Sequence, residues 1–219
     1  MPASVEDAAL PAALAIGALL LLWYVVGNEV MRRRAAALAI WSRRVVDPIG
    51  GRQAVRWLTL QSFRLEVQDA RPPYDHASIT GLTESLDVPA VWLWNRLHGR
   101  RDMVLLQVRL REQPRWGLEL FRPVSLLAGD ARHLARQERW PEEPLDEFRL
   151  ASPGAPAADL ARRLLAAVEE QRENLVRLAV RRRETHLALA LNVPDRGRLP
   201  PERCYQILER LAREVLRAD

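Results

Sequence analysis

The sequence contains no lysine, and all 33 of its basic residues are arginines. We interpret this as a GC-rich coding bias rather than as selection for guanidinium chemistry. The chain has a single cysteine, Cys204. No intrachain disulfide can therefore form, which suits a reducing compartment. The four histidines are scattered without the spacing of metal ligands: His76, His98, His133 and His186.

Sequence motifs of catalysis are also absent: there is no GxSxG, no Walker loop and no GxGxxG. The segment "HGRRD", residues 98–102, is interpreted as a charged hairpin connection rather than a catalytic turn. Cys204 falls on the apolar stripe of the last expected helix, which favours a buried structural thiol over a nucleophile. We therefore expect no enzyme, no cofactor and no metal. An enzyme whose site gathers dispersed residues remains the alternative.

An uncharged stretch of 19 residues, Ala8–Val26, dominates the N-terminal part. As a helix it would span about 28 Å, close to the roughly 30 Å of a bilayer's hydrocarbon core. Trp23 and Tyr24 lie near its end, where aromatic rings favour the headgroup boundary. Residues 1–7 are acidic, unlike the basic start of a signal peptide. The stretch predicts a single transmembrane helix after a short extracytoplasmic N-terminus, rather than a cleaved leader or a buried core helix.

Basic charge is concentrated just after this stretch. Residues 27–56 carry seven arginines against two acids, for a net +5, whereas residues 57–219 carry only +2. The positive-inside rule then places the N-terminus outside the cell (inner) membrane and the C-terminal domain in the cytoplasm. Because the distal domain is nearly balanced, we expect no nucleic-acid partner.

Residues 27–51 are expected to form a basic juxtamembrane helix and linker, with Leu38, Trp41 and Val45 on one face. The helix either lies on the anionic inner leaflet, at about 1 kcal/mol per arginine near the surface, or continues the anchor as a solvated stalk. "DPIGG", residues 47–51, ends it. The residues expected to contact the membrane surface are Arg32, Arg33, Arg34, Trp41, Arg43 and Arg44.

Residues 57–219 predict an α+β domain of mainly antiparallel strands with two or three helices. The strand-like segments are residues 57–67, 78–86, 90–97, 103–112, 115–121, 146–152, 174–182 and 185–193. The first changes phase near Gln61-Ser62, as a bulge would allow. Residues 103–112 and 115–121 are predicted to form a hairpin that turns near Gln113-Pro114.

Helices are expected over residues 155–173 and 200–218, and the segment between the strands at 115–121 and 146–152 gives no clear pattern. Residues 174–182 and 185–193 are expected to pair through a tight turn at Arg183-Glu184. In the second of these strands, leucines alternate with Ala188 and Ala190, which indicates that both faces are covered. In the last helix, Cys204, Leu208, Leu211 and Val215 share one stripe.

Trp92 and Trp94 alternate with Val91 and Leu93 in a segment expected to be a strand. Large aromatic side chains on an outward face mark a contact surface for a partner or for the bilayer. If both faces of the sheet are covered, the same two rings belong to the core. Both interpretations are kept, and Trp92 and Trp94 are the candidate partner-contact residues.

Short landmarks occur in order along the domain: "LQS" at 60–62, "SITG" at 78–81, "LW" at 93–94, "GR" at 99–100, "MVLLQVRL" at 103–110, "RPVS" at 122–125 and "LNVP" at 191–194. In order and approximate spacing over residues 58–217 they resemble the calumin family. Calumin is a single-pass endoplasmic-reticulum protein of the PAT complex, which assists the insertion of multipass membrane proteins.

The resemblance implies a single span, an outside N-terminus and a cytosolic domain, and it carries over no catalytic residues. This chain lacks the long basic coiled-coil tail that the family places near the ribosome, and it lacks a sizeable acidic extracytoplasmic segment. Ribosome contact is therefore not expected from the tail.

The sequence thus predicts a non-enzymatic adaptor whose partners are the lipid bilayer and another membrane protein or its insertion machinery. Two alternatives remain, a membrane-anchored enzyme and a domain that senses anionic lipid.

Overall fold

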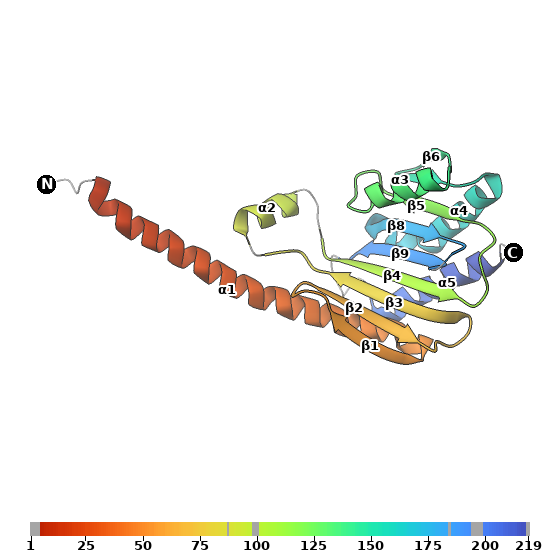
Figure 1. The fold of residues 1–219 in the computed structure, drawn as a ribbon, viewed down its shortest axis with the longest axis horizontal. Coiled ribbons are helices and arrows are strands. Elements are labelled where there is room, and N and C mark those ends of the chain that lie inside the picture. Colours follow the sequence, from red (N-terminus) through yellow and green to blue (C-terminus); the bar gives the residue numbers. More distant parts are fainter. Residues whose placement is uncertain (1–4, 87, 98–100, 184, 194–198, 218–219) are drawn as a thin grey trace.

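The computed structural model describes residues 5–217 except 87, 98–100, 184 and 194–198. It shows an α+β protein in which a long apolar helix precedes a nine-stranded sheet with helices packed on it (Figure 1). Every pair of neighbouring strands is antiparallel. The predicted fold class is confirmed in this respect.

Helix α1 (Val5–Val46) is one unbroken helix of 42 residues. The residues between Leu10 and Val26 project into open space, apart from the half-buried Trp23. From Met31 onward, residues three or four positions apart are buried against the sheet: Met31, Ala35, Leu38, Ser42 and Val45. The helix expected over residues 27–46 is therefore neither a free stalk nor a separate surface helix. It is part of the domain's core, so the domain begins well before the expected Trp57.

The helix ends as expected at "DPIGG". A 3₁₀ turn, η1 (Asp47–Ile49), follows it, and then Gly50 and Gly51 take positive φ angles that favour glycine. This reversal brings the chain into the first strand at the edge of the sheet.

The strands are β1 (Arg52–Trp57), β2 (Ser62–Gln68), β3 (Tyr74–Leu82), β4 (Met103–Leu110), β5 (Leu118–Phe121), β6 (Glu142–Leu145), β7 (Phe148–Ala151), β8 (Leu175–Val180) and β9 (Leu187–Asn192). Their order across the sheet is β1-β2-β3-β4-β9-β8-β5-β7-β6. The expected pairing of the last two strands in sequence, β8 and β9, is confirmed.

Two expectations for the first strands are wrong. The phase change near Gln61-Ser62 is a hairpin turn and not a bulge, because Trp57 of β1 pairs with Phe63 of β2. A short turn and a bulge both shift the alternation of side chains, so the pattern alone does not separate them. The hairpin predicted near Gln113-Pro114 does not form either. β4 pairs with β3 and β9, whereas β5 pairs with β7 and β8.

A third expectation fails at residues 90–97. They form helix α2 (Pro89–Leu97) and no strand. Proline is favoured in the first turn of a helix, where its missing N–H costs least. The alternation from Val91 to Trp94 is too short to specify a strand, and the segment lies outside the sheet, where no neighbouring strand could pair with it.

The remaining helices are α3 (Ala128–Gln137), α4 (Ala155–Ala167) and α5 (Pro201–Arg217), with a 3₁₀ segment η2 (Glu169–Asn174). α4 and α5 fall where the sequence predicts helices, whereas α3 lies in the segment without a clear pattern. α5 packs between the C-terminal half of α1 and α4 on one face of the sheet, and α3 packs against β5.

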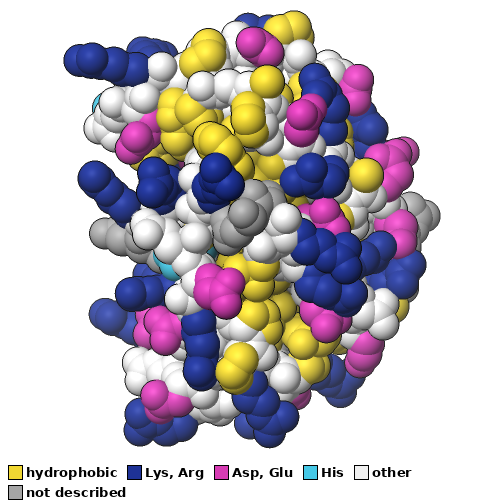
Figure 2. Space-filling view, turned by 90° about the vertical axis from the view of Figure 1, so that its right-hand side faces the viewer, with side chains coloured by type: hydrophobic (Ala, Val, Ile, Leu, Met, Phe, Trp, Pro, Cys, Tyr) yellow, Lys and Arg dark blue, Asp and Glu magenta, His cyan; other side chains and the backbone are white. Residues whose placement is uncertain are grey.

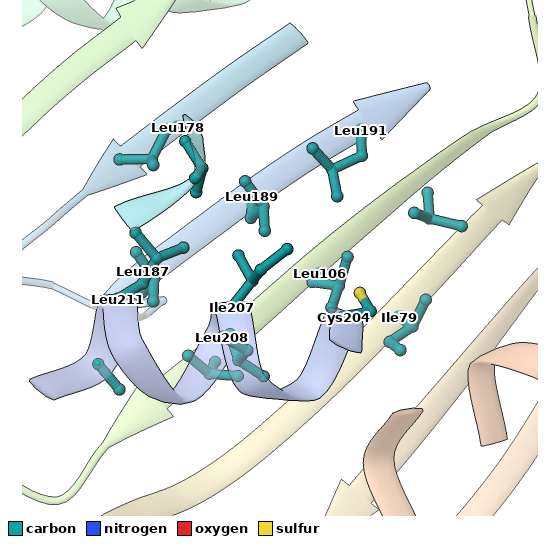
Figure 3. Close-up of a cluster of buried hydrophobic side chains, with 14 of the residues drawn as sticks. Ile79, Leu106, Leu178, Leu187, Leu189, Leu191, Cys204, Ile207, Leu208 and Leu211 are labelled. Atoms are coloured by element: carbon teal, nitrogen blue, oxygen red, sulfur yellow. The ribbon is translucent and has the colours of Figure 1, made fainter. Parts of the chain in front are cut away.

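The core lies between this helical layer and the central strands. Figure 3 shows Ile207, Leu208 and Leu211 of α5 directed at leucines of β4, β8 and β9. The expected stripe of α5 is confirmed, since Cys204, Leu208, Leu211 and Val215 are all buried. Burial raises the pKa of the Cys204 thiol to about 12, so the group stays protonated near neutral pH.

The two faces of the sheet differ from one edge to the other. At β9 both faces are covered, as expected, because Ala188 and Ala190 are buried opposite the leucines. Across β1 to β4 the face turned away from α1 and α5 carries polar side chains such as Arg64, Glu66 and Thr80, which are partly or fully exposed. This open polar face remains available for contact.

The contribution of α1 to the core can be measured at Trp41. Its ring is buried, and its Nε1–H donates to the carbonyl of Leu199 at 2.9 Å. We expect Trp41→Phe to lower the free energy of unfolding of the detergent-solubilised protein by about 1–3 kcal/mol, because the Leu199 carbonyl loses its partner. Ile40→Ala is the matched control, since Ile40 is 60% exposed on the opposite side of the same turn. Equal effects in denaturant titrations would contradict a core position for this half of α1.

Candidate functional site: the junction of the apolar helix and the domain

The most unusual feature of the fold is the connection between β3 and β4. The two strands are paired neighbours, with Leu82 opposite Met103, yet residues 83–102 separate them. Hairpin connections are normally two to five residues long, and much longer ones are usually functional. We call residues 83–102 the arm. Figure 1 shows that its helix α2 reaches past the end of the sheet and lies beside the middle of α1.

Leu86 fastens the arm to α1 through both of its backbone groups. Its carbonyl accepts a hydrogen bond from Trp23 Nε1 at 2.8 Å. Its N–H donates to Met31 Sδ at 3.0 Å. Gly27 lies between these two contacts on the helix, and a Cβ there would come within 3.0 Å of the Leu86 oxygen. A side chain at this position would therefore require the Leu86 backbone to move away from α1 by a few tenths of an ångström.

A second contact joins α2 itself to α1. The rings of Trp23 and Trp92 lie 5.8 Å apart between centroids, at an interplanar angle of 55°. This is a favourable distance for two aromatic rings. Trp92 is thus half-buried against α1, whereas Trp94, two residues further along, is exposed.

The base of the arm is tied to the same end of the sheet. The backbone N–H of Glu84 donates to Asp102 Oδ1 at 2.8 Å, which closes the arm across its two ends. The N–H of Thr83 donates to the carbonyl of Gln61 in the β1–β2 turn at 2.9 Å. The arm and this turn therefore form one unit at the end of the sheet.

Several large apolar side chains of this unit are exposed. We call the set the apolar collar: Leu58, Leu60, Leu82, Val88, Val91, Leu93, Trp94 and Leu97, all 40–74% exposed. Scattered exposed leucines are ordinary, but a contiguous apolar patch marks a contact with a membrane or a partner. Here the α2 part of the collar lies beside the exposed apolar half of α1. The collar includes Trp94, one of the two candidate partner-contact residues predicted from the sequence.

The arginines expected at a membrane surface fall into two groups. Arg32, Arg33 and Arg34 are exposed within the two turns after Gly27. Arg33 and Arg32 pair with Glu29 at 2.6 and 2.9 Å, and the hydrogen bond from Arg33 is the main cause that lowers the pKa of Glu29. These three side chains lie immediately beside the junction.

Arg43 and Arg44 are also exposed, but they lie about 25 Å further along the helix axis than Val26. That separation is well beyond the Debye length of roughly 8–10 Å at physiological salt. The inclusion of Trp41 among the surface residues is wrong, because its ring is only 5% exposed and packs in the core.

A concave site lies at the opposite end of the sheet. It is a cleft of about 550 Å³ between α3 and the turn after β8, lined in part by Glu119, Arg181, Arg182 and Arg183. Glu119 is buried, and both of its oxygens are already engaged: Oε2 by Arg177 at 2.8 Å and Oε1 by Arg181 at 2.8 and 3.0 Å. Figure 2 looks onto this end and shows arginine and acidic side chains interspersed across it.

The described histidines are His76, His133 and His186. Within the described ranges, no cluster of three His, Cys, Asp or Glu side chains is arranged to hold a metal ion. Most of the "HGRRD" segment, residues 98–100, lies outside the described residues, as does Glu184 of the turn after β8.

No model of a protein family matches this chain, and no curated protein is similar to it at a significant level.

One helix in the described part of the chain is long and apolar enough to cross a membrane, by length and composition. It is α1, and its most apolar stretch is not buried by any part of the protein. A signal sequence near an N-terminus can have the same length and composition.

The Gly27 contact gives a direct test of how the arm is held. We expect Gly27→Val to push the Leu86 backbone away from α1, because the added side chain overlaps its carbonyl oxygen. Hydrogen exchange of peptides covering residues 83–95 should then become faster, with the Leu86 amide most affected. Gly17→Val is the matched control, since a Cβ at Gly17 meets nothing within 4 Å. Unchanged exchange in the Gly27 variant would contradict the described docking.

Proposed function

We propose that this chain is a single-pass membrane protein whose domain stands at the cytoplasmic face of the cell (inner) membrane and binds another membrane protein. The observation that carries the proposal is the continuity of α1. The same helix exposes an uncharged apolar surface over its first half and supplies core side chains over its second half. Because one continuous helix joins the apolar half to the domain, the domain is held at a fixed distance from the bilayer that would surround the apolar half.

Continuity also favours an anchor over a cleaved leader. A leader is removed from a mature domain that folds without it. Here Trp23 and Met31 make hydrogen bonds to Leu86 from positions on either side of Val26. Cleavage at the end of the apolar stretch would remove the Trp23 contacts and leave α2 without its partner ring.

The orientation follows from charge. Arg32, Arg33 and Arg34 are exposed just beyond the apolar half, whereas the stretch from Ala8 to Val26 has no charge. By the positive-inside rule, arginines close to a span stay on the cytoplasmic side.

An adaptor role is supported by a surface that remains uncovered. The face of β1 to β4 that is turned away from α1 and α5 carries partly or fully exposed polar side chains, such as Arg64, Glu66 and Thr80. The resemblance of the domain's landmarks to calumin suggests the class of partner: an integral membrane protein or the machinery that inserts it.

We expect a tagged full-length protein, solubilised gently from native membranes, to copurify with a stoichiometric integral-membrane or ribosomal partner. A photo-crosslinking residue placed at Thr80, on the open face, should form an adduct with that partner. The same residue at Ile40, on the exposed side of α1, serves as the control. Recovery of no stoichiometric partner under mild detergent would overturn the adaptor proposal.

The orientation has its own test. A reporter active only in the cytoplasm should work when fused after Asp219, and a reporter active only in the periplasm should stay silent. The reverse pattern would show that the domain lies outside.

The alternatives from the sequence receive less support. The cleft beside Glu119 gathers arginines and acids, but both oxygens of the buried carboxylate are already bonded by the guanidinium groups of Arg177 and Arg181. A lipid-sensing surface would use the arginines from Arg32 to Arg44, and of these Arg43 and Arg44 lie far along the helix from the end of the proposed span.

A further inference from the structure

We propose that α2 is an interfacial helix that lies in the same leaflet as the end of the α1 span, with lipid covering the apolar collar around it. This inference rests on the proposed single-pass arrangement and adds a second membrane contact to it. The domain would then be attached at two points, and two points fix its rotation about α1 as well as its height.

Depth along α1 places α2 at the membrane boundary. The uncharged stretch ends at Val26, three residues and about 4.5 Å after Trp23. The ring of Trp92 in α2 contacts that of Trp23 in a tilted arrangement, and the Leu86 carbonyl accepts the Trp23 hydrogen bond. Helices that lie in the interface bury their apolar face about 5–10 Å into the boundary between headgroups and acyl chains. α2 therefore stands at the depth where such helices bind.

The side chains of α2 are divided as an interfacial helix requires. Val91, Trp94 and Leu97 are three residues apart and project outward, and Leu97 is 74% exposed. On the other side, Trp92 packs on α1 and Asn95 is buried. The outward face is thus apolar, while the polar amide is turned toward the protein.

The backbone polar groups of Leu86 in the arm are hydrogen-bonded within the protein, as surroundings with little water require. Irregular backbone is tolerated at membrane depth only where its polar groups are satisfied within the protein. Leu86, in the irregular segment before α2, has its carbonyl bonded by Trp23 and its N–H bonded by Met31. A loop in water would need neither contact, since water would serve both groups.

Lipid is favoured over a protein partner as the occupant because the collar is continuous with the apolar surface of α1. The apolar surface of α1 requires a cover other than water. The bilayer that would surround Leu14 to Val26 also reaches α2, so no additional protein is needed to cover the collar. A partner helix or a second copy of this chain would cover the collar only on one side.

The test uses single cysteines in the full-length protein in phosphatidylcholine–phosphatidylglycerol vesicles. Val91→Cys and Leu97→Cys report on α2, Leu14→Cys on the proposed span, and Val124→Cys on water, since Val124 is 96% exposed. The native thiol of Cys204 is buried with a raised pKa and does not compete for the label. A spin label at each position is probed for collision with oxygen, which concentrates in lipid, and with a water-soluble nickel chelate.

We expect labels at Val91 and Leu97 to collide with oxygen as the Leu14 label does, and to be several-fold less accessible to nickel than the Val124 label. Circular dichroism of each variant confirms that the label has not disturbed the fold. All four positions are exposed, so no core contact is removed.

Three outcomes would overturn the inference, and they differ. Nickel accessibility at Val91 and Leu97 equal to that at Val124, with Leu14 shielded, would place α2 in water and leave the anchor intact. Shielding of both positions from oxygen and nickel alike would show a protein partner or a second copy over the collar. Nickel accessibility at Leu14 as well would overturn the proposed span itself.

Discussion

The arrangement of this protein depends on one constraint: α1 does not break between its apolar half and its buried half. An α-helix keeps a fixed rise and rotation per residue, so the direction of its first half follows from the packing of its second half. Leu38 and Val45 are locked into the core, and Trp41 is bonded to the segment before α5. The position of Trp23 relative to the sheet is thereby determined, although the two lie far apart in the fold.

The arm uses that fixed position. Because Trp23 and Met31 are held still, the Leu86 backbone finds both of its hydrogen-bond partners already in place. Glycine at position 27 lets the Leu86 backbone approach α1 closely, since a Cβ there would lie 3.0 Å from the Leu86 oxygen. The arm and the β1–β2 turn then present their leucines at one end of the sheet. At the opposite end, the surface returns to the mixed charge of an ordinary solvated domain (Figure 2).

Patterns that extend over many residues could be predicted from the sequence, and patterns that extend over only a few residues could not. The uncharged stretch, the stripe of α5 and the alternation in β9 each extend over many residues, and the structure contains the corresponding helix or strand in each case. The short alternation around Trp92 suited a strand as well as a helix, and only the isolation of the segment from the sheet separates the two. Pairing of β5 with β7 and β8 depends on contacts between segments distant in sequence, which local pattern does not encode.

The junction itself could be predicted only in part. The arginine cluster and the two tryptophans of α2 can be recognised in the sequence. Where they lie relative to the domain follows only from the continuity of α1. The sequence predicts Trp41 at the membrane surface, whereas its indole lies in the core. Gly27 gave a weak signal, as a small residue within a helix of larger ones. Its partner at Leu86 follows from tertiary packing alone.

The central claim is that the apolar half of α1 and the domain form one rigid body. It is tested most directly by a distance measurement between spin labels at Leu14→Cys and Val124→Cys, by pulsed dipolar spectroscopy of the protein in lipid nanodiscs. A continuous helix predicts a single narrow distance distribution. A broad distribution, or one with several separate maxima, would show a hinge between the two halves and would contradict the account.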